Sequence, residues 1–550
     1  MADSMQFQLG KHRRKALQGL LFSLTLAVGW GLGIPSTLAA SKITIRLGPF
    51  QQAIAIADLE KFAKTGKLPD SLQIYSSFLT PQIRELLNRR LQVDPAVADK
   101  FVAELMRSPA GNQLITSLGV AIPGSTVETL QTALNLGLRQ VNGLTVVGFL
   151  QAYPGDNVTV DASKALQIAL QFNSNNLQSQ AIGALLSREL LVNSNTKFQP
   201  SFDPAAVGKE AFEQQTLTLQ DRQRNRVIPV DIYWGKGDAQ APLVVISHGF
   251  GANRKFFSYL ARHLASQGIT VAAIEHPGSN VNAVTKASEQ ANLAQLLPAK
   301  EFIERPKDIS FLLNELAKLN TQSGLLQGKL NTEKVTVIGH SLGGYTALAL
   351  VGAQIDLGEL RQFCKTNLSL GESPGDWLQC AATALKETKI QLKDERVKSA
   401  IALNPLVGKL FGKNGLSQVT NPVLIFTSTE DSLTPTLKHQ IAPFAQLRGA
   451  KYLLTAIGAT HMSVSDPAYL VSDTTNIIQE KRGEETNSLR QLIRGVSLAF
   501  VKQLTPEAKI YQPFLTPAYA QSLSTSEIPL RLNSDLPGTI KPWLGFVSNN

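Results

Sequence analysis

The stretch Lys334–Leu350, KVTVIGHSLGGYTALAL, decides the fold of this 550-residue chain. Its β-branched residues Val335–Ile338 predict a short buried strand. Residues Tyr345–Leu350 are rich in Ala and Leu, which predicts the first turns of a buried helix. Between the two lies Gly339-His340-Ser341-Leu342-Gly343, a Gly-x-Ser-x-Gly pattern. We therefore expect a sharp strand-to-helix turn with a serine at its tip.

This turn constrains the residues on both sides of Ser341. It leaves no room for side chains beside the serine, so we expect glycine to be required at Gly339 and Gly343. It also lifts the Ser341 hydroxyl above the sheet and leaves the Leu342 N–H unpaired at the helix N-terminus, where it can face a developing oxyanion. The alternative is a glycine-rich turn with an idle serine. The strand before the turn and the small-residue helix after it favour the first interpretation.

Length, composition and charge limit the class of protein. A chain of 550 residues predicts two domains plus a targeting segment, and 43% hydrophobic with 17% charged residues is typical of globular proteins. The net charge is +11, but the basic residues are dispersed along the chain. A solvated surface is therefore expected rather than a nucleic-acid-binding one, although the charge also allows weak attraction to an anionic membrane. Nothing in the sequence specifies an oligomeric state.

The first 40 residues have the pattern of a signal peptide. A basic cluster at Lys11–Lys15 precedes an apolar run at Ala16–Ile34, and small residues then offer cleavage after Ala39 or Ala40. We expect the protein to be exported to a periplasm, a thylakoid lumen or the extracellular space. The alternative is an uncleaved membrane anchor, since the apolar run is nearly long enough to span a bilayer.

The chain contains two cysteines, Cys364 and Cys380. In an oxidising compartment such a pair predicts one disulfide, and the alternative is two buried free thiols. No cysteine or histidine cluster has metal-ligand spacing, so we expect no metal and no cofactor.

Residues 41–172 predict a separate, mainly helical domain with one strand at Lys42–Leu47. Thr80-Pro81 is typical of a helix start, and Val127–Leu150 predicts one long amphipathic helix. No catalytic constellation occurs in this region, so we expect it to cover the site, guide substrate or bind a partner. Residues 173–211, rich in Asn, Gln and Ser, predict a linker with a helix at Gln178–Leu191.

Residues 212–510 predict an α/β domain. Alternation at Thr216–Leu219 and Ile228–Trp234 indicates an antiparallel hairpin. Apolar strands separated by helices then indicate a mostly parallel sheet covered on both faces, with its chemistry beyond the carboxyl ends of the strands. Residues 511–550 are expected to form a C-terminal extension. The expected strands are Leu243–Ser247, Thr270–Ile274, Val335–Ile338, Ser399–Leu403, Val423–Thr427 and Tyr452–Ala456, and the main helices are Phe256–Ser266, Arg305–Leu319, Tyr345–Val351 and Leu489–Gln503.

A nucleophilic Ser341 needs a base and a group that orients the base. Of seven histidines, His461 follows the last sheet strand in a small-residue loop, and we predict that it is the general base. His276 also lies at a strand's carboxyl end and is the alternative. For the acid we predict Asp431, which follows the strand Val423–Thr427, with Glu430 as the alternative. The order Ser, Asp, His is that of the α/β-hydrolases.

A second oxyanion donor is expected in Ser247-His248-Gly249-Phe250-Gly251, which follows the strand Leu243–Ser247. A glycine-flanked turn there can aim the Phe250 N–H at the same point as the Leu342 N–H. The alternative is a plain strand-to-helix loop.

Residues 212–510 resemble an α/β-hydrolase of the platelet-activating-factor acetylhydrolase type, a group related to the dienelactone hydrolases. The stretches that carry the resemblance are Ser247–Gly251, Ala272–Asn280, Glu304–Ser310 and Gly339–Gly344. Residues 41–172 are similar to a helical domain of unknown function that precedes such hydrolases in cyanobacteria. The resemblance implies short-chain acyl esters or lipid esters as substrates.

The position of the acid departs from the pattern of the animal acetylhydrolases. In those proteins the acid follows the strand just after the serine helix, but here that strand ends in Leu403-Asn404-Pro405. We therefore expect the acid one strand later, at Asp431.

Two segments are expected to shape the pocket. Val281–Lys300 connects a strand to the next helix, and Gly352–Asp394 is an insertion of the kind that often forms a lid. The sequence thus predicts a serine ester hydrolase that needs no cofactor. The alternatives are a non-catalytic lipid- or partner-binding protein on the same fold, and a lactone, amide or polyester hydrolase.

Overall fold

The structure is a computed structural model. It describes residues 39–548 except 48–49, 77–78, 80, 89, 92–97, 108, 141–142, 162–163, 166–173, 193–197, 236–239, 290–296, 367–371 and 470–479. The predicted signal peptide lies almost entirely outside the described residues. Within the described part of the chain, no helix combines the length and apolar character needed to cross a membrane.

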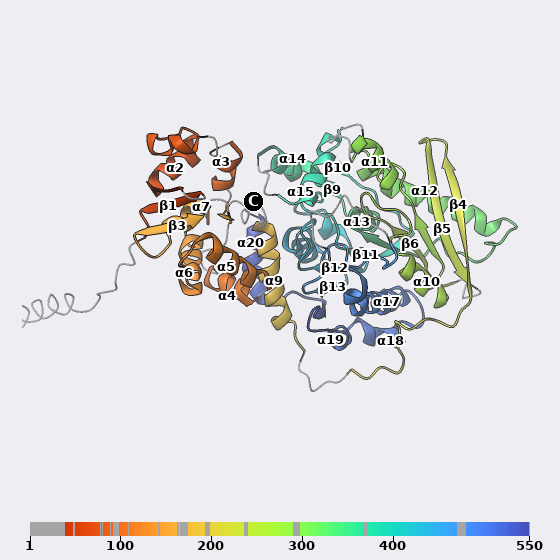
Figure 1. Ribbon diagram of the computed structural model, residues 1–550. Helices are drawn as coiled ribbons and strands as arrows, with labels where there is room; N and C mark the ends of the chain where they lie inside the picture. Colours follow the sequence, from red (N-terminus) through yellow and green to blue (C-terminus); the bar gives the residue numbers. More distant parts are fainter. Residues whose placement is uncertain are drawn as a thin grey trace, which may run out of the picture.

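A nine-stranded sheet forms the body of the molecule (Figure 1). Its order is β14-β13-β12-β11-β8-β6-β7-β5-β4, and the six strands from β13 to β7 run parallel. The antiparallel hairpin β4–β5 and the antiparallel strand β14 form the two edges. All six predicted parallel strands and the hairpin are confirmed. The bounds are β4 Phe212–Asp221, β5 Arg226–Gly235, β6 Leu243–Ser247, β7 Val271–Ile274, β8 Val335–His340, β11 Val397–Leu403, β12 Val423–Ser428, β13 Lys451–Ala456 and β14 Leu530–Asn533.

Alternate residues of each central strand enter two different cores. In β6, for example, Val245 packs on one face of the sheet and Val244 on the other. Helices α12 (Glu301–Thr321) and α13 (Leu342–Leu350) cover the first face, while α10 (Ser258–Ser266) and α17 (Asn487–Lys502) cover the second. Burial on both faces explains why these strands are apolar throughout. The fold is therefore an α/β-hydrolase fold, as expected, and the carboxyl ends of the parallel strands share one edge.

Residues 39–161 form a smaller lobe beside this body (Figure 1). The lobe is mainly helical, but it also contains a three-stranded sheet of order β2-β1-β3, of which the sequence predicted only β1. Its strands are β1 Lys42–Leu47, β2 Phe50–Ala55 and β3 Asn157–Asp161. Its helices are α2 Ile56–Thr65, α3 Pro81–Asn88, α4 Ala98–Arg107, α5 Pro109–Ala121, α6 Val127–Leu138 and α7 Val146–Gln151.

The prediction of a single helix over Val127–Leu150 is wrong, because α6 and α7 are separate. Helix α6 ends at Leu138, and Gly143 in the connection has φ +77°, a left-handed conformation that favours glycine and that a continuous helix does not contain. The Thr145 hydroxyl then accepts a hydrogen bond from the Gly148 N–H at 2.9 Å and caps the start of α7.

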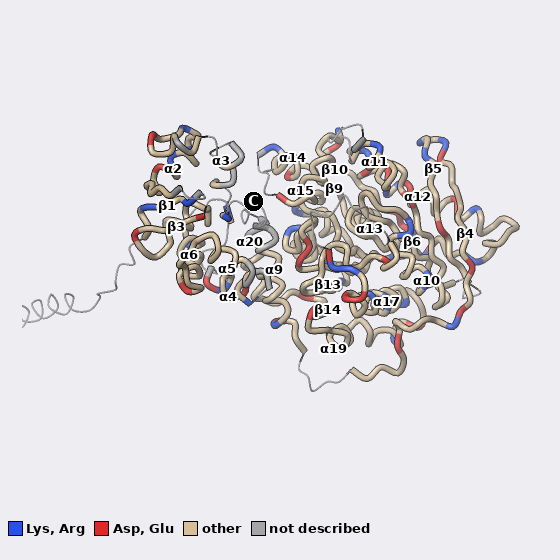
Figure 2. The backbone as a smooth tube through the Cα atoms, viewed as in Figure 1, with Lys and Arg blue, Asp and Glu red and all other residues tan. Residues whose placement is uncertain are grey.

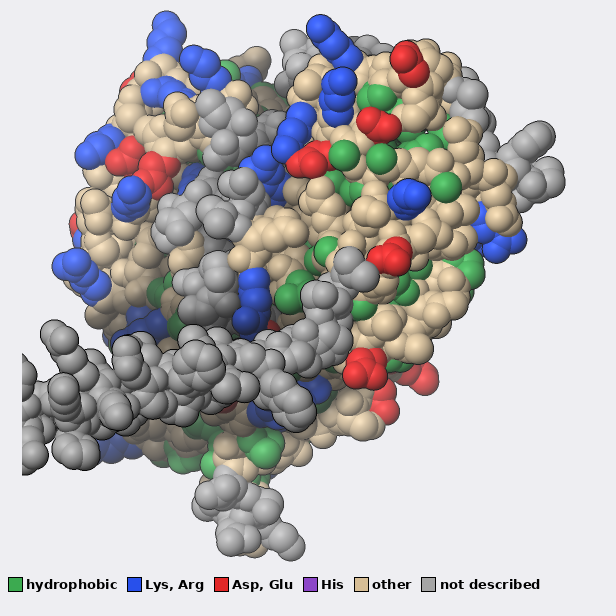
Figure 3. Space-filling model, turned by 90° about the vertical axis from the view of Figure 1, so that its left-hand side faces the viewer, with side chains coloured by type: hydrophobic (Ala, Val, Ile, Leu, Met, Phe, Trp, Pro, Cys, Tyr) green, Lys and Arg blue, Asp and Glu red, His purple; other side chains and the backbone are tan. Residues whose placement is uncertain are grey.

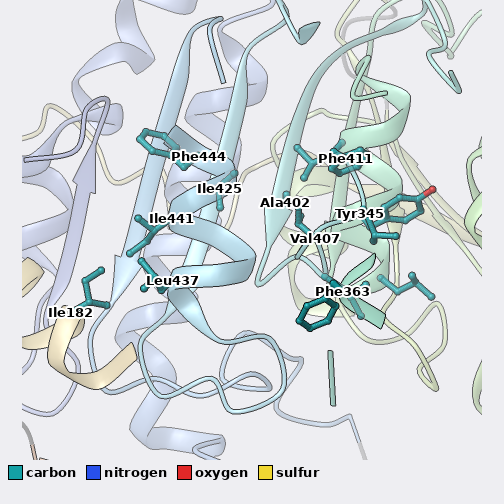
Figure 4. Close-up of a cluster of buried hydrophobic side chains, with 14 of the residues drawn as sticks. Ile182, Tyr345, Phe363, Ala402, Val407, Phe411, Ile425, Leu437, Ile441 and Phe444 are labelled. Atoms are coloured by element: carbon teal, nitrogen blue, oxygen red, sulfur yellow. The ribbon is translucent and has the colours of Figure 1, made fainter. Parts of the chain in front are cut away.

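Helix α9 (Ser174–Glu189) joins the lobe to the body. It packs against α4 and α5, so part of the predicted linker 173–211 is a well-packed helix. Figure 4 shows Ile182 of α9 beside Leu437 of η6 (Leu437–Ile441), a π-helical turn of the body. The buried apolar face of α9 explains why this segment is not a flexible connection.

The C-terminal residues 511–550, which we predicted as an extension, contain regular secondary structure. They supply β14 and the helices α19 (Pro517–Ser522) and α20 (Lys541–Ser548). Arg531 of β14 donates a hydrogen bond to the Ser187 carbonyl of α9 at 2.8 Å. Trp543 of α20 is fully buried, with its ring centroid 5.5 Å from that of Phe101 in α4. The C-terminal segment thus completes the sheet and contacts the lobe.

The insertion Gly352–Asp394 contains α14 (Leu357–Thr366) and α15 (Pro374–Gln379), and the predicted disulfide Cys364–Cys380 joins it internally. Buried polar side chains attach the insertion to η6, because Lys438 Nζ lies 2.7 Å from Glu372 Oε2 and His439 Nε2 lies 3.3 Å from Asp376 Oδ1. In Figure 4, Phe363 of α14 lies among the apolar side chains of the body. The insertion is packed as part of the core in this structure.

Charged side chains are distributed over the described residues without a single-sign tract. Figure 2 shows Lys and Arg interspersed with Asp and Glu along the chain. Figure 3, viewed from the side of the lobe, shows basic side chains spread over the face rather than gathered in one patch.

Removal of the disulfide tests the packing of the insertion. We expect the double variant Cys364→Ser, Cys380→Ser to lose about 3 kcal/mol of unfolding free energy, because the bond closes a loop between residues 16 apart. Urea denaturation measures the loss. A reductant should destabilise the wild type to a similar extent and leave the double variant unchanged. A wild type that is insensitive to reductant would contradict the prediction.

Candidate active site

Ser341 lies at the junction of β8 and α13 with φ 54° and ψ −117°. This is a conformation that L-residues rarely adopt and that costs about 1–3 kcal/mol. The surrounding backbone holds it there. The Ser341 N–H donates to the Leu403 carbonyl at 2.9 Å, and the Ser341 carbonyl accepts from the Leu406 N–H at 3.0 Å. The end of β11 therefore fixes the turn that presents the serine.

The glycines on both sides of Ser341 are required by close backbone contacts. A Cβ atom on Gly339 would lie 1.9 Å from the Gly343 carbonyl oxygen, and one on Gly343 would lie 2.1 Å from the Ser247 carbonyl oxygen. No side chain fits at either position. The steric reason given for the Gly-x-Ser-x-Gly pattern is thus confirmed.

Asp431 and His461 meet beyond the ends of β12 and β13. His461 Nδ1 lies 2.7 Å from Asp431 Oδ2, and both side chains are buried. Asp431 also accepts hydrogen bonds from the Leu433 and Thr434 N–H groups at 2.9 and 2.8 Å. Since a carboxylate accepts the Nδ1 proton, the ring turns its Nε2 away from Asp431, which is the orientation that a general base requires.

The loop that carries His461 is held next to the serine turn. The His461 carbonyl accepts hydrogen bonds from His340 Nε2 at 3.0 Å and from Asn404 Nδ2 at 3.1 Å. The ring centroids of His340 and His461 are 4.5 Å apart, and His340 precedes Ser341. Among the described contacts there is no hydrogen bond between the Ser341 hydroxyl and His461. In ligand-free enzymes such bonds are often long and tighten when substrate binds.

Two carboxylates raise the pKa of His461. Burial lowers its pKa, but the charge and hydrogen bond of Asp431 and the charge of Glu480 outweigh burial, so the pKa is raised above 6.5. Burial in turn raises the pKa of Glu480, whose Oε2 accepts a hydrogen bond from the Met462 N–H at 2.9 Å. The site thus favours the imidazolium that forms when a base accepts a proton.

The loop after β6 lies directly against the serine turn. A Cβ atom on Gly249 would lie 3.3 Å from Ser341 Cβ and 3.1 Å from His340 Nδ1. Phe250 follows, and the next N–H, of Gly251, donates to the Ser279 carbonyl at 3.0 Å, which ties this loop to the loop after β7. Among the described residues, neither the Phe250 N–H nor the Leu342 N–H has a hydrogen-bond acceptor. Both predicted oxyanion donors are therefore available.

The alternative residues have other partners. Glu430 forms an ion pair with Lys481, with 3.0 Å between Oε2 and Nζ. His276 is fully buried, with Nδ1 3.0 Å from Asp308 Oδ2 and Nε2 3.0 Å from the Ser247 hydroxyl. These partners do not place His276 as the base, or Glu430 as the acid, for Ser341.

Sequence reasoning missed Asn404 and Glu480. Asn404 has φ 42°, and its side chain joins the ends of β11 and β12 by accepting from the Ser428 N–H at 3.0 Å. Asn is among the few residues that adopt this conformation readily, so the Asn-Pro pair at a strand end was a usable signal. Glu480 lies far from any motif, and no local pattern indicates it.

The arrangement suits acyl transfer through a covalent intermediate. It combines a strained serine, a histidine oriented by a carboxylate and two backbone N–H groups that have no acceptor among the described residues, all at one sheet edge. In the described part of the chain, no group of three or more His, Cys, Asp or Glu could hold a metal ion. Fold and site together define an α/β-hydrolase.

Comparison with known proteins is more specific. Residues 231–305 and 312–512, half of the chain, match the family described as platelet-activating factor acetylhydrolase, isoform II, and the chain belongs to this family. Residues 39–161, the lobe, match a family described as an alpha/beta hydrolase of unknown function (DUF1400).

Individual relatives are distant. The chain is 23% identical over 290 residues to the platelet-activating factor acetylhydrolase of Cavia porcellus and 24% identical over 297 residues to that of Canis lupus familiaris. Each match covers 48% of this chain, and 57% and 56% of the respective relatives. The chain thus spans a little over half the length of these relatives.

The serine turn predicts a steep cost for any side chain at Gly339. We expect Gly339→Ala to lower the melting temperature by several degrees and to abolish the native turn, because its Cβ would overlap the Gly343 carbonyl. Gly119→Ala is the control, since nothing lies within 4 Å of a Cβ there and alanine favours a helix. Thermal unfolding of the two variants measures the difference. Equal melting temperatures would contradict the steric account.

Proposed function

We propose that this protein is a serine carboxylic-ester hydrolase that acts on short-chain acyl esters or lipid esters. Ser341 Oγ attacks the ester carbonyl while His461 Nε2 accepts its proton, and the Phe250 and Leu342 N–H groups bind the oxyanion. The observation that carries the proposal is the strained Ser341 beside a His461–Asp431 pair at one sheet edge.

The second half of the reaction uses the same groups. His461 donates its proton to the leaving alcohol as the acyl-enzyme forms on Ser341. It then accepts a proton from water, whose oxygen attacks the acyl carbonyl. When the bond between Ser341 Oγ and the acyl carbon breaks, His461 gives this proton to Ser341 Oγ and the acid leaves. Asp431 keeps the ring in the Nδ1–H tautomer and stabilises its charged form. These steps need no cofactor.

The family supports the substrate class. The relatives are named acetylhydrolases, and platelet-activating factor is a lipid ester, which favours a short acyl group on a lipid or lipid-like alcohol. The insertion lies beside the loop that carries Asp431, because the Gly375 N–H donates to the Leu433 carbonyl at 2.8 Å, and from this position it would restrict the length of the acyl group. We therefore expect activity on p-nitrophenyl acetate and butyrate to exceed activity on the palmitate.

Loss of the nucleophile is the first test. Ser341→Ala should lower kcat for p-nitrophenyl acetate by roughly 10⁴–10⁶-fold, because no acyl-enzyme can form. A fluorophosphonate should label the wild type at Ser341 and leave the variant unlabelled. Ser417→Ala is the matched control, since Ser417 lies before the amino end of β12, remote from the carboxyl edge. A Ser341→Ala variant as active as the control would rule out this mechanism, whereas a wild type that neither hydrolyses the ester nor is labelled at Ser341 would favour a non-catalytic binding protein.

The pH dependence tests the base. His461 must be neutral to accept a proton, so kcat/KM should fall as the pH drops through its raised pKa, above 6.5. Asp431, Glu480 and His340 face the ring. Glu480→Gln removes one negative charge and should move this acidic limb to lower pH, while its amide oxygen can still accept from the Met462 N–H. A limb that stays in place or moves to higher pH would exclude His461 as the titrating base.

A further inference from the structure

A buried polar network lies beneath the loop that carries Phe250. It joins side chains from three stretches that the nucleophile, base and acid do not use, which are the ends of β6 and β7 and the first turns of α12. Its central residue, Arg305, is fully buried and donates to the Ser279 hydroxyl at 2.7 Å and the Ser247 hydroxyl at 3.2 Å. Its Nη2 also donates to the His248 carbonyl. This guanidinium therefore reaches the backbone of the loop itself.

The hydrogen bonds of His248 determine its tautomer. Its Nε2 accepts from the His276 N–H at 3.0 Å, since a backbone N–H can only donate. Its Nδ1 lies 2.7 Å from the Gly249 carbonyl, which can only accept, so Nδ1 carries the proton. The ring is therefore neutral. Burial and the charge of Arg305 lower the pKa of His248 well below its usual value, in agreement with this assignment.

The bond from His248 fixes one particular peptide. The Gly249 carbonyl and the Phe250 N–H belong to the same planar trans peptide, so they point in opposite directions. When the Gly249 carbonyl is held toward the His248 ring, the Phe250 N–H must point away from it. Gly249 lies against Ser341, so the orientation of this peptide decides whether the second donor faces the reacting atoms.

Arg305 fixes the preceding peptide in the same way. It holds the His248 carbonyl, and it sits beside Glu301 and Asp308, which balance its charge. Asp308 Oδ2 also binds His276 Nδ1 at 3.0 Å, and the His276 N–H is the group that supports the His248 ring. Two successive carbonyls of the loop are thus held by one connected set of buried side chains.

We propose that His248 and Arg305 are positioning residues of the oxyanion hole, which hold the Gly249–Phe250 peptide with its N–H directed at the substrate carbonyl oxygen. This inference rests on the proposed function. It assigns a task to the stretches around His248, His276 and Arg305 that the nucleophile, base and acid leave without one.

The test compares two substitutions at His248. His248→Leu removes the ring donor, and we expect kcat for p-nitrophenyl acetate to fall about 10²–10³-fold with KM changed less than about threefold. His248→Asn retains an N–H donor near the position of Nδ1, and kcat should stay within about tenfold of the wild type. A trifluoromethyl ketone, which forms a tetrahedral oxyanion on a serine, should lose affinity in the Leu variant by the same factor as kcat/KM. If His248 had a purely structural role, the affinity for the ketone and kcat/KM would not fall by the same factor.

His263→Leu is the control, because His263 is another buried histidine but packs near Pro204 and Arg494, on the face covered by α17. A folded His248→Leu variant with kcat within threefold of the wild type would overturn the inference. If that variant does not fold, the Asn variant decides: ketone affinity within tenfold of the wild type supports the inference, and a hundredfold loss overturns it. Ester hydrolysis that survives Ser341→Ala would overturn the proposed function instead.

Discussion

The site depends on one constraint, the left-handed backbone of Ser341. A non-glycine residue keeps φ 54° only when its neighbours over-determine it, and here the end of β11 holds the Ser341 N–H and carbonyl from two directions. The same turn brings the Gly343 Cα against the Ser247 carbonyl, so the serine turn and the oxyanion loop cannot move independently. Backbone hydrogen bonds from the end of β11 therefore offset the strain at Ser341. They hold the serine in place without the help of other side chains.

Buried charged side chains lie on two sides of the turn that carries Ser341. On one side, Asp431 and Glu480 raise the pKa of His461 and so favour the protonated form of its ring. On the other side, Arg224 and Arg226 pair with Glu304, Glu301 and Asp308, while burial and the charges of the arginines lower the pKa of His276 well below its usual value. Unpaired buried charges would cost several kcal/mol each, which explains why each carboxylate of this network has a basic partner. One edge of the sheet thus holds a histidine poised to become charged beside two that stay neutral.

The sequence predicted the parts of the fold whose signals are local. The strands β6, β8 and β12 are short and mostly apolar, and Gly339 is required by a contact within the serine turn itself. Strand β14 was missed because Leu530–Asn533 is short and gains its strand character only by pairing with β13. Glu480 and Arg305 were missed as functional for the same reason, because their partners lie on other elements and only the tertiary fold brings them together. The sequence order Ser, Asp, His indicated which distant residues to compare, and the 2.7 Å contact between His461 and Asp431 agrees with it.

The most direct test of the central claim is a crystal structure of the protein after reaction with a phosphonate inhibitor. The account predicts a covalent bond to Ser341 Oγ, with the phosphonyl oxygen about 2.7–3.1 Å from both the Phe250 and Leu342 nitrogens. It also predicts His461 Nε2 within hydrogen-bonding distance of an adduct oxygen. An adduct on another residue, or a phosphonyl oxygen that contacts neither backbone nitrogen, would contradict it.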